Sequence, residues 1–225
     1  MKLENIVPWG RNLTEYREMF LLTEEDLDKK ILGCGDGPAS FNSEVYAQGG
    51  RVVSIDPVYA FSKAQIAARI DVVADEVITQ VRKKRDDFLW ERIPSVEALY
   101  RIRMDAMEIF LKDFEEGKKQ GRYVDASLPK LPFEEELFDL ALSSHFLFLY
   151  SEHLDRAFHK AAILEMLRVS REVRIFPLVG LDGKISQHLK PVMQGLQKEG
   201  YYAAVQKCDY HFQKGADAML VVRKG

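Results

Sequence analysis

The chain has 225 residues, of which 47% are apolar, and this length and apolar content predict one α/β domain with a sizeable core. The formal net charge of −3 excludes a general attraction to nucleic acid or anionic membranes, and the two cysteines, far apart in sequence, favour a reducing compartment without a disulfide framework. Because the N-terminus lacks a long apolar stretch and the most apolar window, residues 137–150, is short and contains Asp139 and His145, we expect a soluble, cytoplasmic protein with no membrane partner.

Helical and extended patterns alternate along the chain. Up to residue 59 the predicted elements are a helix at 12–21, a helix starting at Thr23, a strand at 30–32, a helix between Pro38 and Gly49-Gly50, and a strand at 51–56. After residue 120 they are a strand at 122–125, a strand at 137–143, a helix at 152–169, a strand at 172–176, a helix at 184–199, and closing strands at 201–212 and 218–222. Such alternation predicts a mostly parallel sheet, whose ligands bind at the carboxyl ends of the strands.

Residues 60–120, between the second and third predicted strands, form a long stretch of helical pattern. They include a single proline, Pro94, and are far more numerous than a crossover requires. We expect a helical insertion that forms either a lid over the ligand site or an added packed layer or dimer surface. The basic run Arg82-Lys83-Lys84-Arg85 is followed at once by Asp86 and Asp87, which favours a solvated helix face over nucleic-acid binding.

A glycine-rich loop, Gly33-Cys34-Gly35-Asp36-Gly37-Pro38, follows the first predicted strand. Glycine permits positive φ angles and lets a ligand approach the backbone closely. A dinucleotide fingerprint has glycine at its first, third and sixth positions, whereas the sixth position here is Pro38, which disfavours NAD. Asp56, at the end of the second strand, is placed to accept hydrogen bonds from the hydroxyls of a ribose. These features predict a cofactor of the adenosine type; the alternative is a tight turn and a surface aspartate.

Three further motifs follow in a specific order. Asp125-Ala126 comes after the third predicted strand, Leu131-Pro132-Phe133 comes next, and Phe138-Asp139 opens the fourth strand. With its glycine-rich loop and the acid after the second strand, the chain resembles the class I S-adenosylmethionine-dependent methyltransferases of the methyltransferase type 11 kind. The resemblance extends over residues 22–59 and 121–225.

The resemblance implies a fold and a cofactor site. The fold is a Rossmann-like, doubly wound α/β domain over residues 1–225, with a mostly parallel seven-stranded sheet and an antiparallel last strand. The residues implied to bind S-adenosylmethionine are Gly33, Cys34, Gly35, Gly37, Asp56, Pro57, Asp125, Ala126, Ser143 and Ser144. Asp56 would bind the ribose hydroxyls and Asp125 the adenine amino group, whereas Ser143 and Ser144 would face the transferring methyl group. The family usually has an acid shortly before the first glycine, but Leu32 occupies that position here.

Methyl transfer from a sulfonium is an in-line displacement with a neutral leaving group, so alignment of the acceptor supplies most of the acceleration. A base helps only when the acceptor must lose a proton. His145, at the end of the fourth predicted strand, is the candidate catalytic base, and the alternative is a hydrogen-bonded structural histidine. The histidines and cysteines show no metal-ligand spacing, so we expect no metal.

Several functions remain compatible with these motifs. No Asn-Pro-Pro-Tyr or Asp-Pro-Pro-Tyr follows the fourth strand, which disfavours methylation of DNA bases, so we expect a small-molecule methyl acceptor. A non-catalytic S-adenosylmethionine-binding or interaction module with the same fold is the first alternative. An NAD-dependent oxidoreductase is a less favoured one. The acceptor, the methylated atom and the oligomeric state stay open at this point.

Overall fold

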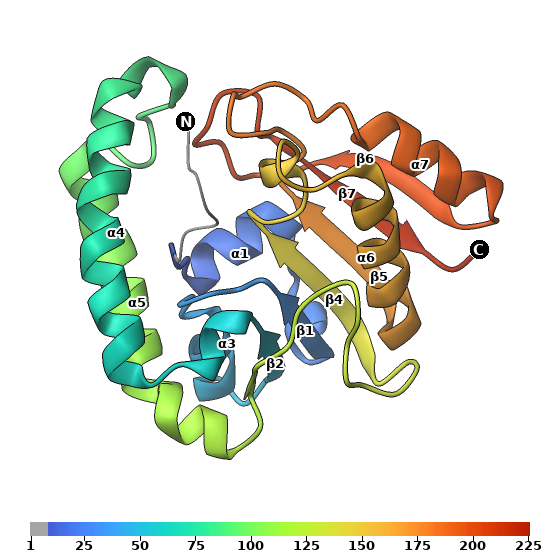
Figure 1. Ribbon diagram of the computed structural model, residues 1–225, viewed down its shortest axis with the longest axis horizontal. Coiled ribbons are helices and arrows are strands. Elements are labelled where there is room, and N and C mark those ends of the chain that lie inside the picture. Colours follow the sequence, from blue (N-terminus) through green and yellow to red (C-terminus); the bar gives the residue numbers. More distant parts are fainter. Residues whose placement is uncertain (1–8) are drawn as a thin grey trace.

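The computed structural model describes residues 9–225. Its strands are β1 (Lys30–Cys34), β2 (Arg51–Ile55), β3 (Tyr123–Val124), β4 (Phe138–Ser144), β5 (Ser170–Phe176), β6 (Tyr202–Lys207) and β7 (Ala218–Arg223). Within the described residues they form one seven-stranded sheet in the order β3-β2-β1-β4-β5-β7-β6 (Figure 1). β7 runs antiparallel to β5 and β6, whereas the other neighbouring strands are parallel. The predicted fold class, a mostly parallel sheet with an antiparallel last strand, is therefore confirmed.

Helices cover both faces of this sheet. The α-helices are α1 (Leu13–Phe20), α2 (Glu24–Leu27), α3 (Phe41–Ala47), α4 (Lys63–Lys83), α5 (Val96–Lys119), α6 (Arg156–Val169) and α7 (Leu189–Lys198), and the short 3-10 helices are η1 (Pro57–Ala60), η2 (Arg85–Asp87) and η3 (Phe148–Tyr150). α1 packs on β5 and β7 and α3 on β2, whereas α6 packs on β4 and β5 and α7 on β6. The core is accordingly divided into one apolar cluster on each side of the sheet and a third, smaller one formed by η1, α4, α5 and β3.

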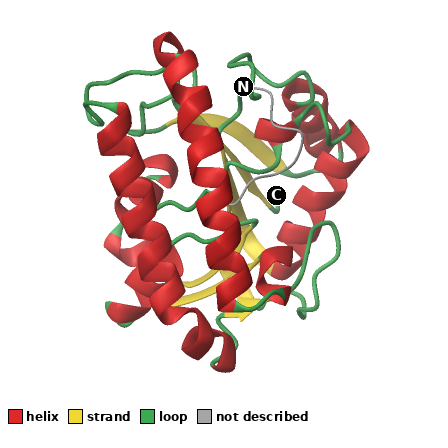
Figure 2. Ribbon diagram, turned by 60° about the vertical axis from the view of Figure 1, so that its left-hand side comes forward, coloured by secondary structure: helices red, strands yellow, loops and turns green. Residues whose placement is uncertain are grey.

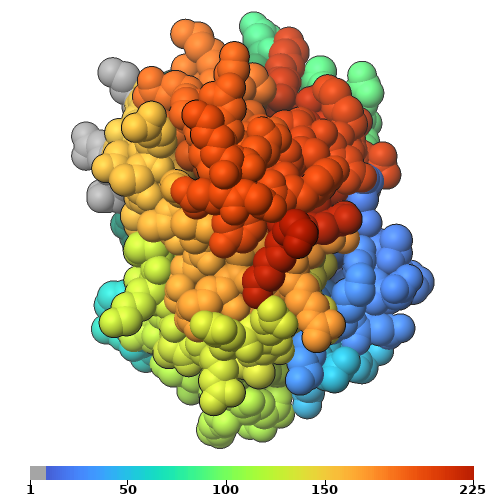
Figure 3. All heavy atoms as spheres, turned by 90° about the vertical axis from the view of Figure 1, so that its right-hand side faces the viewer, coloured from blue at the N-terminus to red at the C-terminus, as the bar shows by residue number. Residues whose placement is uncertain are grey.

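α4 and α5 form a separate pair of long helices between β2 and β3. They lie side by side along one flank of the molecule (Figures 1 and 2), and α5 also contacts α3 and β3. Ser62 and Ser95 begin these helices as N-caps, since the side chain of each accepts a hydrogen bond from a backbone N–H of the first turn. The opposite side of the molecule, seen in Figure 3, is formed in its upper part by the C-terminal third of the chain, drawn in orange to red. None of the described helices is long and apolar enough to span a membrane.

Several predicted boundaries differ from the structure, and the helix expected at 184–199 begins only at Leu189. The strand expected at 201–212 ends at Lys207, because residues 208–217 leave the sheet and turn toward the insertion, where the Leu89 N–H donates to the carbonyl of Phe212 over 2.7 Å. The helix expected from residue 152 begins at Arg156, because the Asp155 side chain caps it by accepting from the Phe158 N–H. Segments 208–217 and 145–155 thereby stay free to border the site described below.

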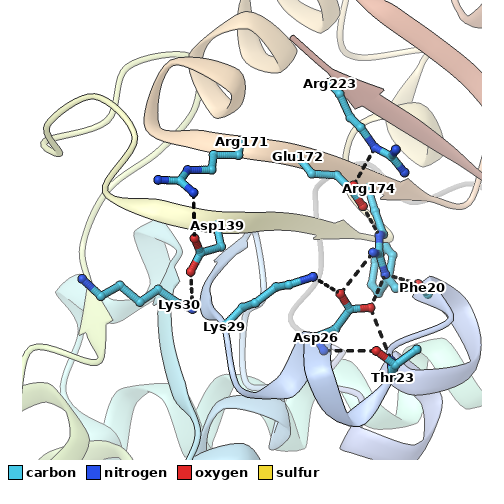
Figure 4. Close-up of polar contacts among 10 residues, drawn as sticks. All are labelled: Phe20, Thr23, Asp26, Lys29, Lys30, Asp139, Arg171, Glu172, Arg174 and Arg223. Carbon is cyan, nitrogen blue, oxygen red and sulfur yellow. Dashed lines mark hydrogen bonds and ion pairs between the residues drawn. The ribbon is translucent and has the colours of Figure 1, made fainter. Parts of the chain in front are cut away.

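A polar network holds α1 and α2 against the strands (Figure 4). Arg174 of β5 donates to the carbonyl of Phe20, at the end of α1, and to the carboxylate of Asp26 in α2, over 2.8 and 2.9 Å. Lys29 also donates to Asp26. Burial alone would raise the pKa of Asp26, but the hydrogen bonds from Lys29 and Arg174 lower it, so this carboxylate is ionised. The network fixes the position of α1, which carries Glu15 and Tyr16, two residues of the site described below.

Candidate functional site

A cavity of about 820 Å³ lies at the carboxyl ends of the parallel strands, between the sheet and the α4–α5 pair. Its base comes from residues directly after β1, β2, β3 and β4, and these include Gly35, Asp56, Ala126 and His145. The remaining walls come from α4, η2, α5, the segment before β7, the segment after β4 and residues near the start of the chain, such as Trp9 and Arg11. The cavity therefore occupies the position at which ligands bind in doubly wound α/β folds.

The glycine loop presents bare backbone to this cavity. Gly35 and Gly37 both line it and have φ angles of +72° and +54°, which other residues rarely adopt. A Cβ atom on Gly35 would lie 3.1 Å from the ring of Phe146, so a larger residue would also crowd that side chain. The loop is held in place because the Gly35 N–H donates to the carbonyl of Ile55 and the Gly37 N–H donates to Asp56 Oδ2, both over 2.9 Å.

Asp56 directly follows β2 and lines the cavity. Each carboxylate oxygen accepts one backbone hydrogen bond, Oδ2 from Gly37 and Oδ1 from Val58 over 2.8 Å, and each retains a further lone pair. Burial raises the pKa of Asp56, and the nearby charge of Asp125 raises it further. Asp125 itself is exposed and does not line the cavity, although its neighbour Ala126 does. Two carboxylates thus lie close together at this end of the site.

A third carboxylate, Asp36, lies within the glycine loop and was not among the predicted site residues. It is buried and accepts hydrogen bonds from the Tyr16 hydroxyl over 2.8 Å and from Ser54 Oγ over 2.6 Å. Burial raises its pKa to about 6, although both hydrogen bonds act in the opposite direction. Its side chain lies directly beside Gly33, where a Cβ atom would be 1.8 Å from Oδ2. Sequence reasoning did not identify it, because an acid within a glycine-rich loop is typical of a turn residue.

The predicted cofactor residues fall into two groups in the structure. Those that line the cavity are Gly35, Gly37, Asp56, Pro57, Ala126 and Ser144. Those that do not line it are Gly33, Cys34, Asp125 and Ser143. Cys34 is fully buried below the loop, and burial raises the pKa of its thiol well above the ordinary value. Ser143 is also fully buried, and its Oγ has no hydrogen-bond partner among residues 9–225.

His145 lines the cavity at the end of β4 in a left-handed conformation, with a φ angle of +53°. Its backbone N–H donates to the carbonyl of Phe176 over 2.6 Å, and its Nδ1 lies 2.9 Å from Ser144 Oγ. Burial lowers the pKa of His145 well below its ordinary value, and the charges of Arg11 and Arg103 lower it further. The ring is therefore neutral at physiological pH, and its Nε2 has no hydrogen-bond partner within the described part of the chain.

The arginines near His145 belong to a cluster that we call the arginine cluster, made of Arg11, Glu15, Arg103 and Tyr210. Arg103 Nη1 donates to Glu15 Oε2 over 2.5 Å, and their side chains are 1% and 8% exposed. The Tyr210 hydroxyl donates to Glu15 Oε1 over 2.9 Å. Burial alone would raise the pKa of Glu15, but the charge and hydrogen bond of Arg103 outweigh it and lower this pKa, so Glu15 is an anion.

Sequence reasoning missed the arginine cluster. Arg103 lies on the buried stripe of α5 with Leu99, Ala106 and Phe110, and an arginine at helical spacing among core residues was a usable signal. Arg11 and Tyr210 carried no such signal, because only the fold brings the start of the chain and the segment before β7 together. Among residues 9–225 no group of His, Cys, Asp and Glu side chains could hold a metal ion.

The chain was compared with protein-family models, with known sequences and with solved structures. No family model matches it. It is 33% identical over 225 residues to "Uncharacterized protein MJ0045" of Methanocaldococcus jannaschii, and this match covers 100% of the chain and 99% of that relative. This level of identity over the full length shows common membership of one protein family.

Two solved structures resemble the fold with TM-scores of 0.51. Magnesium protoporphyrin IX methyltransferase (ChlM) from Synechocystis PCC 6803 with bound SAM is 11% identical and covers 94% of this chain and 78% of its own. Mitomycin 7-O-methyltransferase MmcR is also 11% identical and covers 95% of this chain and 54% of its own. At these identities the likeness concerns the fold, and it agrees with the strand order of the sheet. The chain thus has the fold of the class I S-adenosylmethionine-dependent methyltransferases and belongs to the same family as MJ0045 of Methanocaldococcus jannaschii.

Proposed function

We propose that the protein transfers a methyl group from S-adenosylmethionine to a small-molecule acceptor. The observation that carries this proposal is the Asp56 carboxylate, which lies beside the bare backbone of Gly35 and Gly37 at one cavity. A carboxylate at the end of the second strand is the group that binds the hydroxyls of a ribose in doubly wound folds. The fold shared with two methyltransferases that act on magnesium protoporphyrin IX and on mitomycin supports this choice of chemistry.

The residues at this end of the cavity fit the cofactor in shape and charge. Gly35 and Gly37 leave room for a ligand against the backbone, and the lone pairs left on Asp56 suit two ribose hydroxyls. Ala126 and the exposed Asp125 beside it would hold the adenine. Together with Asp36 these acids surround the strand ends with negative charge, which favours a cation. When bound, S-adenosylmethionine supplies an electrophilic methyl group on a positively charged sulfur.

The chain contributes mainly alignment and exclusion of water. The α4–α5 pair closes the cavity on the side away from the sheet, so an acceptor would be held in a confined, largely apolar space. His145 would take a hydrogen bond from the acceptor at Nε2 when its Nδ1–H donates to Ser144 Oγ. Burial, followed by the charges of Arg11 and Arg103, disfavours a charged imidazolium, so His145 would orient the acceptor through this hydrogen bond rather than hold its proton.

The experiment that tests the proposal measures ligand binding and turnover separately. We expect S-adenosylhomocysteine to raise the melting temperature and NAD to leave it unchanged. The reverse result would favour an NAD-dependent oxidoreductase and remove the proposal. Radiolabelled S-adenosylmethionine would then be supplied with a broad panel of small-molecule acceptors. Cofactor binding without methyl transfer to any of them would favour a non-catalytic module with this fold.

A further inference from the structure

The half of the cavity away from the glycine loop differs in character from the half at the strand ends. Its walls come from α4, η2, α5 and two loops and are mainly apolar, with Val77, Val81, Phe88, Leu99, Leu154 and Phe212 as examples, while Lys84 and Asp87, which pair with each other, also line it. The arginine cluster borders this apolar half beside His145, because Arg11, Arg103 and Tyr210 line the cavity and the charges of both arginines act on His145. We call this place the inner end of the cavity. A ligand seated here meets an apolar surface first and guanidinium groups at its end.

The arginine cluster holds more positive than negative charge. Its two guanidinium groups face a single carboxylate, Glu15, which is already bound to Arg103 and Tyr210. Burial raises the pKa of the Tyr210 hydroxyl to about 12, so it is neutral, and His145 is neutral as well. Arg11 forms no ion pair with any carboxylate among residues 9–225 and donates from Nη1 to the carbonyl of Trp9 over 3.0 Å. Within the described residues, Arg11 therefore has no carboxylate partner of its own.

The guanidinium groups also have unused hydrogen-bond donors. Within the described chain, Nε of Arg11 and Nε of Arg103 are buried without a hydrogen-bond partner. Arg103 is 1% exposed, whereas Arg11 is half-buried, and both line the cavity. Burial, followed by the charge of Arg103, lowers the pKa of Arg11 to about 10, which still leaves it charged. A buried, unpaired cation is costly, and an anion delivered by a ligand removes this cost.

We propose that the methyl acceptor carries a carboxylate-type anion on an apolar body, and that Arg11 and Arg103 bind this anion at the inner end of the cavity. This inference rests on the proposed methyl transfer, because it assigns the acceptor to the half of the cavity that the cofactor leaves open. Arginine binds carboxylates through paired N–H groups, so it also orients the acceptor. Apolar contact with α4 and α5 holds the remainder of the molecule.

A carboxylate at the arginines could also come from the methionine part of the cofactor, and binding measurements separate the two sources. The first titration measures S-adenosylhomocysteine and 5′-methylthioadenosine, which lacks the carboxylate, on the wild type and on Arg11→Met. If the arginines serve the acceptor, Arg11→Met weakens both by less than about twofold. A loss confined to S-adenosylhomocysteine would assign Arg11 to the cofactor and overturn the inference.

The second titration uses protein saturated with S-adenosylhomocysteine and compares 2-naphthoate with its uncharged analogue 2-naphthamide. We expect the wild type to prefer the naphthoate by at least about tenfold, because only the naphthoate brings a charge to the guanidinium groups. Arg11→Met should abolish this preference, whereas Arg11→Lys, which keeps the positive charge, should retain part of it. The double variant Arg103→Met with Glu15→Gln removes the buried ion pair as a unit and should also reduce the preference.

The matched control is Arg69→Met. Arg69 lines the same cavity from α4 but is exposed and lies outside the arginine cluster. Its loss changes the charge of the cavity by the same amount, and we expect it to keep the naphthoate preference within about twofold. A loss in Arg69→Met with none in Arg11→Met would move the anion to another part of the cavity and overturn the inference. No preference in the wild type would overturn it too, whereas failure of S-adenosylhomocysteine to bind would instead remove the proposed function.

Discussion

The two ends of the cavity carry opposite charge and have different origins. At the strand ends, Asp36, Asp56 and Asp125 bring three carboxylates together on or beside consecutive β–α loops of the sheet. At the inner end, Arg11 and Arg103 come from the start of the chain and from the helical insertion. Opposite charge at the two ends suits a reaction between a cationic methyl donor and an anionic acceptor. The comparison also shows that the fold provides one end, whereas the insertion helps to provide the other.

The largest effect is expected from Glu15→Gln, which removes the carboxylate that compensates Arg103. Two buried guanidinium groups then remain without a counter-charge, so the free energy of unfolding should fall by about 3–5 kcal/mol. Glutamine keeps an oxygen for the Asn12 N–H, so the cap of α1 survives. Urea denaturation measures the change. The control, Glu24→Gln, breaks an exposed ion pair with Arg17 and should behave like the wild type; equal losses in both variants would contradict a special role for the buried cluster.

The second prediction concerns the acidic end and the pH dependence of stability. The pKa of Asp36 is about 6 in the folded protein, against an ordinary value of 3.8 for an aspartate, so the folded state holds an extra proton between these values. Stability from this group is complete below the lower value and is lost as the pH rises through the higher one. Asp36→Asn should therefore be more stable than the wild type, by up to about 3 kcal/mol near pH 8, and this gain should shrink toward pH 4. A gain that is the same at both pH values would contradict the buried charge.

Asp56→Ala tests the assignment of the acidic end to the cofactor. It removes a charged acceptor of two hydroxyl hydrogen bonds, so S-adenosylhomocysteine should bind more weakly by roughly 1–3 kcal/mol in a calorimetric titration. Asp125→Ala serves as the matched control, because that carboxylate is exposed and we expect a smaller loss. Unchanged affinity in Asp56→Ala would mean that the ribose does not bind at the end of β2.

The smallest effect is expected from His145→Asn, and its sign is opposite to that of the Asp36 variant. Folded His145 stays neutral well below 6.5, whereas an unfolded histidine takes up a proton there, so this residue makes stability fall as the pH decreases. Asparagine tolerates the left-handed backbone, and the variant should lose this slope, which is at most about 1.4 kcal/mol per pH unit. Denaturation at several pH values measures it. An unchanged slope below pH 6.5 would show that the folded histidine titrates normally.

Much of the acidic end could be predicted because its residues are close in sequence to strand ends. The glycine loop and Asp56 follow short apolar runs, and the parallel sheet brings such ends to one edge. Asp36 was the exception, because an acid inside the loop is typical of a turn residue until its contact with Ser54 is seen. The same local reasoning identified His145 at the end of β4 without its surroundings.

The sequence by itself determined the succession of strands and helices along the chain and the position of the glycine loop, because these depend on local apolar spacing and turn residues, whereas the antiparallel last strand was implied by the family resemblance. Only the tertiary structure decided that Glu15, Arg103 and Tyr210 meet. Their contacts join residues 88 and 195 positions apart, and no short-range pattern encodes such a distance. The packing of α5 against the core and the turn of residues 208–217 toward the insertion bring the members of the arginine cluster together. The cluster and its charge therefore form only when the whole domain folds.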